Sequence, residues 1–457
     1  MTEAYPQDPW VRPVDRRMAS ARAWDEAIDD VRKLPGMADF LCPSTLPTLL
    51  PAGSDGPVVV VNVSRLRSDA LIVHQEAVRS IELPRLTHDT VLEQVAGYLE
   101  ELHRVARAED DLDRARRALG TDAGVPAARR HEVARDAVIE TAQRRDEALL
   151  DVLEWLWDGL ADPVLTELGM DGGPPSGKLP RLWWCPTGLL TLLPLHAAGY
   201  HDTGAAVGDE RRGGEPIGDP TSEAHTARGG ADRRTVLDRV VSSYTPTLRA
   251  LRDARATPAA PVDVRRMLVV SMPQTPGQQD LPNVLRERAA VGRLIAGATF
   301  LDGKHARRDT VLDELARHAW VHFSCHGDQN LEEPSRGGLL LHDDLLTVNE
   351  LSYLERQGEF AFLSACKTAT GGARLPDEAI TLSAALHHSG YRHVIGTLWS
   401  VLDDTAADVA EVVYQELTSD GRFEPDRAAY ALHRAVRDIR DRGSAAGAWS
   451  PFTHTGP

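Results

Sequence analysis

The stretch Trp320–Gly327, WVHFSCHG, is a mostly apolar run that ends on a histidine followed by a glycine. A continuous apolar run of this length is typical of a strand buried on both faces of a sheet. Ligands of open α/β sheets bind beyond the carboxyl ends of the strands, so His326 is a candidate for chemistry. Whether it acts depends on a nucleophile at the end of a neighbouring strand.

A second buried strand, Phe360–Cys366 with the sequence FAFLSAC, ends on such a residue. We expect Cys366 and His326 on the same rim of the sheet, where the imidazole is a suitable base for a thiol that is mostly protonated at neutral pH. Gly327 leaves room for the backbone to approach a carbonyl. The N–H groups of Gly327 and Cys366 are therefore candidate donors to an oxyanion.

The chain around these strands alternates strands with single helices from Val236 onward. Strands are expected at 265–273, 298–303 and 392–399, and helices at 283–295, 308–319, 377–390, 403–421 and 426–443. This alternation predicts an α/β fold with a mostly parallel sheet covered by helices on both faces.

The amino-terminal part has a different pattern. A helix is expected at 19–34, strands at 57–64 and 69–84, and two long antiparallel helices over 88–168 with a break at Gly120–Pro126. Residues 179–199 suggest a strand, a turn and a second strand. Residues 201–235 are almost devoid of apolar side chains, which predicts a flexible linker.

Composition excludes several classes of protein. The net charge of −17 over 457 residues disfavours direct binding of nucleic acid or anionic lipid. Four widely spaced cysteines without a CxxC pair argue against a zinc site or a disulfide scaffold, and no stretch is long and apolar enough to be a membrane segment. With no secretory signal at its amino terminus, the chain is expected to be cytoplasmic.

The motifs HFSCHG, FLSACKTATGG and PDEAITLSAALHHSGYRHVIGTLWSVLDD together resemble the CHAT domain, a caspase-like, separase-related family of clan CD cysteine peptidases. The resemblance covers roughly residues 57–457 and implies that His326 is the catalytic base and Cys366 the nucleophile. It also implies a division into an amino-terminal segment (1–56), a pseudo-protease half with the helical hairpin (57–200), a linker (201–235) and an active half (236–457).

The implied function is that of a cysteine endopeptidase that cleaves a specific protein partner, without cofactor or metal, in bacterial defence or signalling. CHAT domains commonly follow helical repeats, but about 55 upstream residues are too few for such an array. The usual clue to an activating partner protein is therefore missing. Four acidic residues near the expected rim, Asp377, Glu378, Asp403 and Asp404, would favour Arg or Lys before the cut bond. Alternatively, Asp377 and Asp403 cap the helices that follow them.

Other interpretations remain open at this point. The chain could be a scaffold or regulatory module that has kept the fold without turnover, or a hydrolase of non-peptide acyl groups. Cys185 and His196 form a weaker second pair, and Cys325 is expected on the strand face opposite His326. Arg211-Arg212 and Arg233-Arg234 in the linker suggest self-cleavage as a hypothesis.

Overall fold

The computed structural model describes residues 13–37, 40–121, 124–172, 177–201, 234–328, 336–354, 358–364 and 381–457. The chain divides into two compact units, Met1–Leu49 and Leu50–Pro457. The first contains the expected helix, α1 (Pro13–Arg32), and the short α2 (Leu46–Leu49). Everything described below belongs to the second unit.

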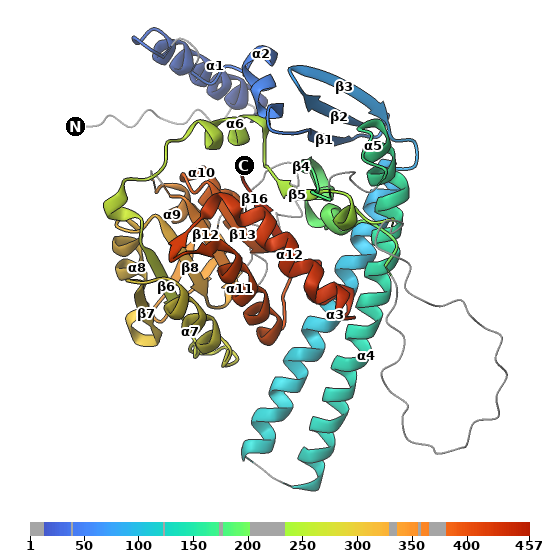
Figure 1. Ribbon diagram of the computed structural model, residues 1–457, viewed down its shortest axis with the longest axis vertical. Helices are drawn as coiled ribbons and strands as arrows, with labels where there is room; N and C mark the ends of the chain where they lie inside the picture. Colours follow the sequence, from blue (N-terminus) through green and yellow to red (C-terminus); the bar gives the residue numbers. More distant parts are fainter. Residues whose placement is uncertain are drawn as a thin grey trace, which may run out of the picture. The chain divides into compact units, whose positions relative to one another are not determined.

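Eleven strands of the second unit form one sheet in the order β3-β2-β1-β4-β5-β16-β13-β12-β8-β6-β7 (Figure 1). Neighbours are parallel except at β3–β2, β2–β1 and β16–β13. The mostly parallel sheet predicted from the apolar runs is therefore confirmed. Its strands are β1 (Val58–Val63), β2 (Ser68–His74), β3 (Ala77–Glu82), β4 (Arg181–Pro186), β5 (Val241–Tyr244), β6 (Met267–Ser271), β7 (Thr299–Asp302), β8 (Trp320–Ser324), β12 (Phe360–Ser364), β13 (His393–Thr397) and β16 (Phe452–Thr455).

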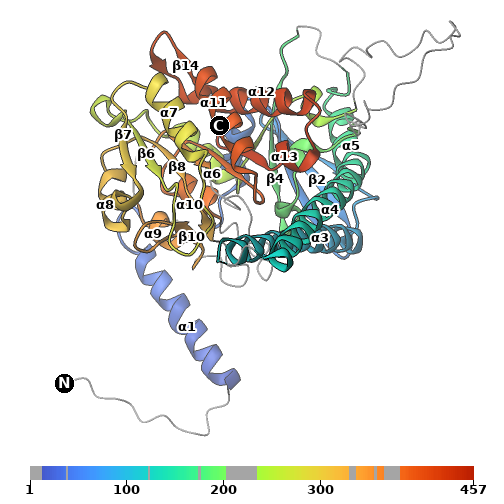
Figure 2. The ribbon, with the colours of Figure 1, turned by 90° about the horizontal axis from the view of Figure 1, so that it is seen from below.

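Helices cover both faces of the carboxyl-terminal part of the sheet (Figure 2). Strand alternation turns Val321 and Phe323 of β8 to one face, where they pack with α8 (Arg308–Leu315), α9 (Val348–Ser352) and α10 (Leu382–His388). The opposite face is covered by α7 (Val284–Leu294), α11 (Asp403–Leu417) and α12 (Ala428–Asp441). Both faces are thus buried, which explains the continuous apolar runs in the sequence.

The two long helices predicted over 88–168 are confirmed as α3 (His88–Thr121) and α4 (Val125–Leu156), which lie side by side in Figure 1. Pro126 occupies the first turn of α4, where its missing N–H costs nothing. The chain continues through a short π-helix, Trp157–Ala161, into α5 (Asp162–Glu167). Among the described helices, none has an apolar stretch long enough to cross a bilayer.

Two local predictions differ from the structure. The strand expected over 69–84 folds back on itself, so β2 and β3 form a hairpin whose turn residues Gln75 and Glu76 have φ of 50° and 61°. The second strand expected within 179–199 is instead two 3-10 helices, Gly188–Leu192 and Leu195–Ala197. Pro194 between them has no N–H for a strand ladder. Most of the expected linker, residues 202–233, lies outside the described residues.

Strand β16 lies in the middle of the sheet although it is the last strand in the sequence. It pairs antiparallel with β13, where Ile395 faces His454, and parallel with β5, where Thr455 faces Tyr244. The indole of Trp183 on β4 donates a hydrogen bond to the carbonyl oxygen of Gly456 at 2.8 Å. β16 therefore joins the strands of residues 57–200 and 236–244 to those of the carboxyl-terminal part, so one sheet runs through both expected halves.

Candidate active site

His326 lies two residues beyond the end of β8, at the carboxyl edge of the sheet. β8 is buried along its length, whereas His326 is half-buried. The chain then enters the short strand β9 (Gly327–Asp328), which pairs with β10 (Gly338–Leu340) outside the main sheet. The N–H of Leu340 donates to the carbonyl oxygen of His326 at 2.9 Å, which fixes the backbone at this position.

One nitrogen of the His326 ring has a defined partner. Nε2 lies 2.7 Å from the carbonyl oxygen of Gln279, in the connection between β6 and α7. A carbonyl oxygen only accepts hydrogen bonds, so Nε2 carries the proton and Nδ1 of the neutral ring keeps its lone pair. The ring is thereby oriented as a base whose reactive nitrogen is Nδ1.

Cys366, the expected nucleophile, lies outside the described residues, as do Asp377 and Glu378. The strand that leads to Cys366 is described. β12 pairs in parallel with β8, and Ser364 faces Ser324 in this register. Ser364 precedes Cys366 by two positions, and Ser324 precedes His326 by two positions. The two adjacent strands therefore end at the same level of the sheet, and each is followed two positions later by one of the two residues.

Gly327 has a backbone suited to donation. Gly327 faces Leu339 in the β9–β10 ladder, and the neighbouring residues Leu340 and His326 are joined by a hydrogen bond. Hydrogen-bonded and non-hydrogen-bonded pairs alternate along an antiparallel ladder, so Gly327 and Leu339 form a non-hydrogen-bonded pair. The N–H groups of such a pair point away from the partner strand. The N–H of Gly327 is thus directed away from β10, as an oxyanion donor requires.

The two described acidic residues of the expected pocket differ in their surroundings. Asp403 is half-buried in the first turn of α11, and its carboxylate accepts a hydrogen bond from the backbone N–H of Asn283 at 2.7 Å. It does not cap its own helix, contrary to the alternative interpretation. Burial raises the pKa of Asp403, and the N–H of Asn283 opposes that shift. Asp404 is exposed.

A buried polar cluster lies beneath this edge and was not anticipated. His322 of β8 contacts the hydroxyl of Tyr414 on α11 through Nδ1 at 2.9 Å, and the Oε2 of Glu287 on α7 through Nε2 at 3.0 Å. The hydroxyl of Ser324 lies 2.6 Å from His322 Nε2 and donates to Glu287 at 3.0 Å. His322 and Ser324 are two positions apart on β8 and therefore share a strand face, and this spacing was the available signal.

The competing candidates have different environments. Burial raises the pKa of the Cys185 thiol to about 12, and burial lowers the pKa of His196 to about 3. Cys185 contacts the carbonyl of Pro246, and His196 contacts the hydroxyl of Tyr244. The two residues therefore bond to different partners and are not activated. Cys325 is buried in the core together with Val321 and Phe323.

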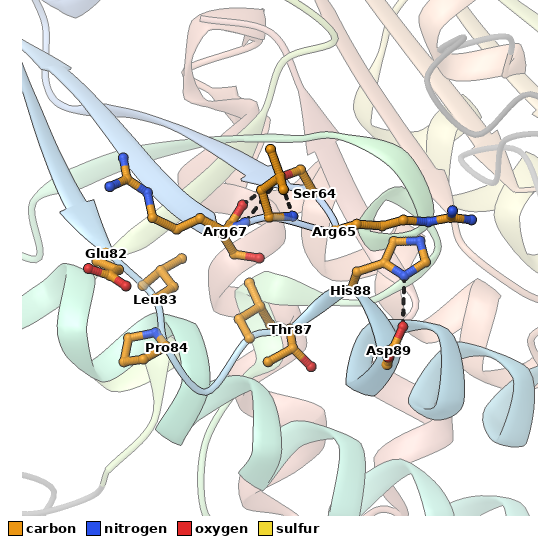
Figure 3. Close-up of a pocket in the computed structure, with 12 residues that line it drawn as sticks. Ser64, Arg65, Arg67, Glu82, Leu83, Pro84, Thr87, His88 and Asp89 are labelled. Atoms are coloured by element: carbon orange, nitrogen blue, oxygen red, sulfur yellow. Dashed lines mark hydrogen bonds and ion pairs between the residues drawn. The ribbon is translucent and has the colours of Figure 1, made fainter.

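The described residues contain no group of three or more His, Cys, Asp or Glu side chains that could hold a metal ion. A pocket of about 380 Å³ does exist elsewhere, between the β1–β2 turn and the start of α3 (Figure 3). It is lined by Arg65, Arg67, Thr87 and His88, among others. In strand order six strands separate β2 from β8, so this pocket is remote from His326.

The fold is α/β, with a mostly parallel sheet covered by helices on both faces and a His-Gly step just beyond the end of the inner strand β8. Residues 150–457 match the family model of the CHAT domain. The chain therefore belongs to the CHAT domain family, as its motifs indicate.

Among the solved structures that resemble the chain are two crystal structures of the Saccharomyces cerevisiae separase–securin complex. Their TM-scores are 0.53 and 0.54, at 10% and 9% sequence identity. The matches cover 90% of this chain but only 31% and 30% of the matched chains, so the chain spans about a third of their length. At this identity the likeness concerns the fold. No curated protein matches the sequence.

Proposed function

We propose that the protein is a cysteine endopeptidase in which Cys366 is the nucleophile and His326 the base. The observation that carries this proposal is the parallel register of β8 and β12, in which Ser324 faces Ser364 two positions before each residue. Neighbouring strands lie ~4.8 Å apart, a spacing compatible with proton transfer between side chains that extend from adjacent strand ends.

The proposed reaction follows from the orientation of the imidazole. Nδ1 of His326 takes the thiol proton, and the thiolate attacks the substrate carbonyl. The N–H groups of Gly327 and Cys366 stabilise the oxyanion, and the imidazolium protonates the amine that leaves. Water, deprotonated by His326, then cleaves the thioester and restores the thiol. The carbonyl of Gln279 keeps the ring in one orientation throughout.

The proposed substrate is a protein with a basic residue before the cut bond. Asp377, Glu378, Asp403 and Asp404 are the candidate acidic residues, and charge-assisted hydrogen bonds to Arg or Lys would supply the preference. Of the described pair, the exposed Asp404 is better suited to meet a substrate than Asp403, which already accepts a hydrogen bond. Self-cleavage at the arginine pairs of 201–235 is part of this proposal.

The amino-terminal half, residues 57–200, is proposed to be a pseudo-protease half that supports the active half, residues 236–457. The inert environment of Cys185 supports this division. The separase of the solved structures is in complex with securin. By analogy we propose that a protein partner controls this chain, in a cytoplasmic role in bacterial defence or signalling.

The test is cleavage of a peptide library by the full chain, with Cys366→Ala as the matched control. We expect cuts after Arg or Lys by the wild type and none by the variant. A thiol-reactive peptide probe should label the wild type faster than His326→Ala. Equal labelling, together with an uncut library, would favour a scaffold without turnover. Turnover of small esters alone would favour a hydrolase of other acyl groups.

A further inference from the structure

We propose that Asp403 and Glu287 are positioning residues, which hold the segment Gln279–Asn283 so that its carbonyl orients His326. This inference rests on the proposed function, because it assigns the groups that prepare the proposed base. We call residues Gln279–Asn283 the β6–α7 segment. It is described throughout, and its two ends make the two hydrogen bonds on which the inference depends.

At its first residue the segment meets the end of β8, where the carbonyl oxygen of Gln279 accepts from His326 at 2.7 Å. At its last residue it meets the start of α11, where the N–H of Asn283 donates to Asp403 at 2.7 Å. α11 follows β13 in the chain. One short segment is therefore tied to the elements that follow two different strands.

The backbone of the segment has contacts of its own. The N–H of Leu281 donates to the carbonyl oxygen of Pro273 at 2.9 Å, and the N–H of Val284 donates to the carbonyl oxygen of Leu281 at 3.3 Å. The segment therefore bends directly into the first turn of α7. A displacement of Asn283 would move this turn, and with it the carbonyl of Gln279 at the other end of the segment.

Glu287 fixes α7, the helix that follows the segment, against β8. Its carboxylate is only 2% exposed and binds both His322 and Ser324 of β8. Removing this anchor would free the first turn of α7, in which Asn283 is the capping residue. Glu287 therefore fixes the helix that follows the segment against β8, and Asp403 fixes the last residue of the segment against α11.

The outer face of α7 is held to α11 by ion pairs. Arg286 binds Asp408 at 2.7 Å and Arg293 binds Glu411 at 3.1 Å. These pairs are exposed and contribute little each. Besides the backbone hydrogen bond from Leu281 to Pro273, the buried contacts of Glu287 and the half-buried contact of Asp403 are therefore the ones expected to set the segment's position.

Asp403 and its neighbour Asp404 are expected to have different roles, positioning for Asp403 and substrate recognition for Asp404. Asp403 would act through an accepting oxygen, which an asparagine side chain also supplies. A residue that selected basic substrates would act through its charge, which asparagine lacks. The pair Asp403→Asn and Asp403→Ala therefore distinguishes positioning from substrate recognition, and Asp404→Asn is the matched control on the neighbouring exposed carboxylate.

The experiment measures the ¹⁵N shifts of the His326 ring in the full chain, with His326→Gln used for assignment. The wild type and Asp403→Asn should show one tautomer, protonated at Nε2. Asp403→Ala and Glu287→Ala should lose that single-tautomer signature. In parallel kcat should fall about tenfold or more in Asp403→Ala, with KM nearly unchanged, since small misplacements of catalytic groups are costly. Asp403→Asn should restore kcat.

Two outcomes would overturn the inference. One is a folded Asp403→Ala protein, shown by an unchanged unfolding transition, whose His326 tautomer is that of the wild type. The other is an Asp403→Asn protein as impaired as Asp403→Ala, with KM raised only for basic substrates. If no peptide is cleaved by the wild type, the proposed function fails, whereas the tautomer measurement still decides the positioning role.

Discussion

The carbonyl oxygen of Gln279 lies 2.7 Å from Nε2 of His326. A backbone group therefore determines which ring nitrogen of the candidate base carries the proton. No side-chain carboxylate is involved in this contact. Backbone carbonyls are positioned by the fold around them, and here that fold is the start of α7 with its buried anchors on β8 and its contact with α11. The reactivity of His326 should therefore respond to residues that never touch it.

The first prediction concerns the dyad itself. His326→Ala should lower turnover about 10²- to 10⁴-fold, the usual contribution of a general base, and should slow alkylation of Cys366 at neutral pH. The measurement is the rate of peptide cleavage and of iodoacetamide labelling. His388→Ala, which removes an exposed imidazole at the end of α10, is the control and should change neither rate. Equal effects of the two variants would contradict the assignment.

The second prediction concerns the buried cluster. Glu287→Leu should destabilise the fold by about 3–5 kcal/mol, because it leaves His322 and Ser324 without their buried partner. Glu287→Gln should cost less, since it retains an accepting oxygen. Glu411→Gln, which removes an exposed ion pair with Arg293, should cost under about 1 kcal/mol. Urea unfolding of the three variants gives these values, and a Glu287→Leu protein as stable as Glu411→Gln would refute the prediction.

The third prediction concerns the residue that follows β16. Gly456 has φ of 133°, and a Cβ there would meet the carbonyl oxygen of Arg392. Gly456→Ala should therefore destabilise by more than the ~1–3 kcal/mol of backbone strain alone. Gly443→Ala is the control, because Gly443 has φ of 82° and open space around it. If thermal unfolding midpoints fall equally in both variants, the steric argument is wrong.

The fourth prediction concerns acid stability. His196 and His433 line a cavity of about 20 Å³, and their Nε2 atoms have no partner among the described residues. Burial lowers the pKa of both to about 3. In the unfolded chain they titrate near ~6.5, so below that pH only the unfolded state takes up their protons. Stability should be full above about pH 6.5 and should fall as the pH drops toward 3.

The measurement is the denaturation midpoint at pH 7, 6 and 5, compared with His433→Leu. Each such histidine contributes up to ~1.4 kcal/mol per pH unit within the window, so the variant should lose less stability on acidification. An identical pH dependence of variant and wild type would show that His433 does not carry this effect.

Much of the fold follows from the sequence because parallel strands buried on both faces leave continuous apolar runs. Val321 and Phe323 on one side, and His322 and Ser324 on the other, lie between helices. The position of His326 at the strand end was readable for the same reason. Its pairing with Cys366 stays a prediction, since Cys366 lies outside the described residues.

Other features depend on contacts between distant residues, which periodicity does not encode. Glu287 is an ordinary acidic residue of an amphipathic helix in sequence, and only the packing of α7 on β8 buries it beside His322. The contact of Asp403 with Asn283 likewise joins the starts of two helices that are 120 positions apart. The β2–β3 turn at Gln75 and Glu76 lacks the Gly or Asn that usually marks a two-residue hairpin.

The central place of β16 has a consequence for biosynthesis. Until Phe452–Thr455 has been made, β5 and β13 each present an unpaired edge, and such edges readily pair with strands of other chains. Closing the sheet also requires contacts across a long separation in sequence, which slows folding. A chain that lacked Phe452–Thr455 would keep two incomplete sheets with open edges, so β16 is the strand that closes the sheet.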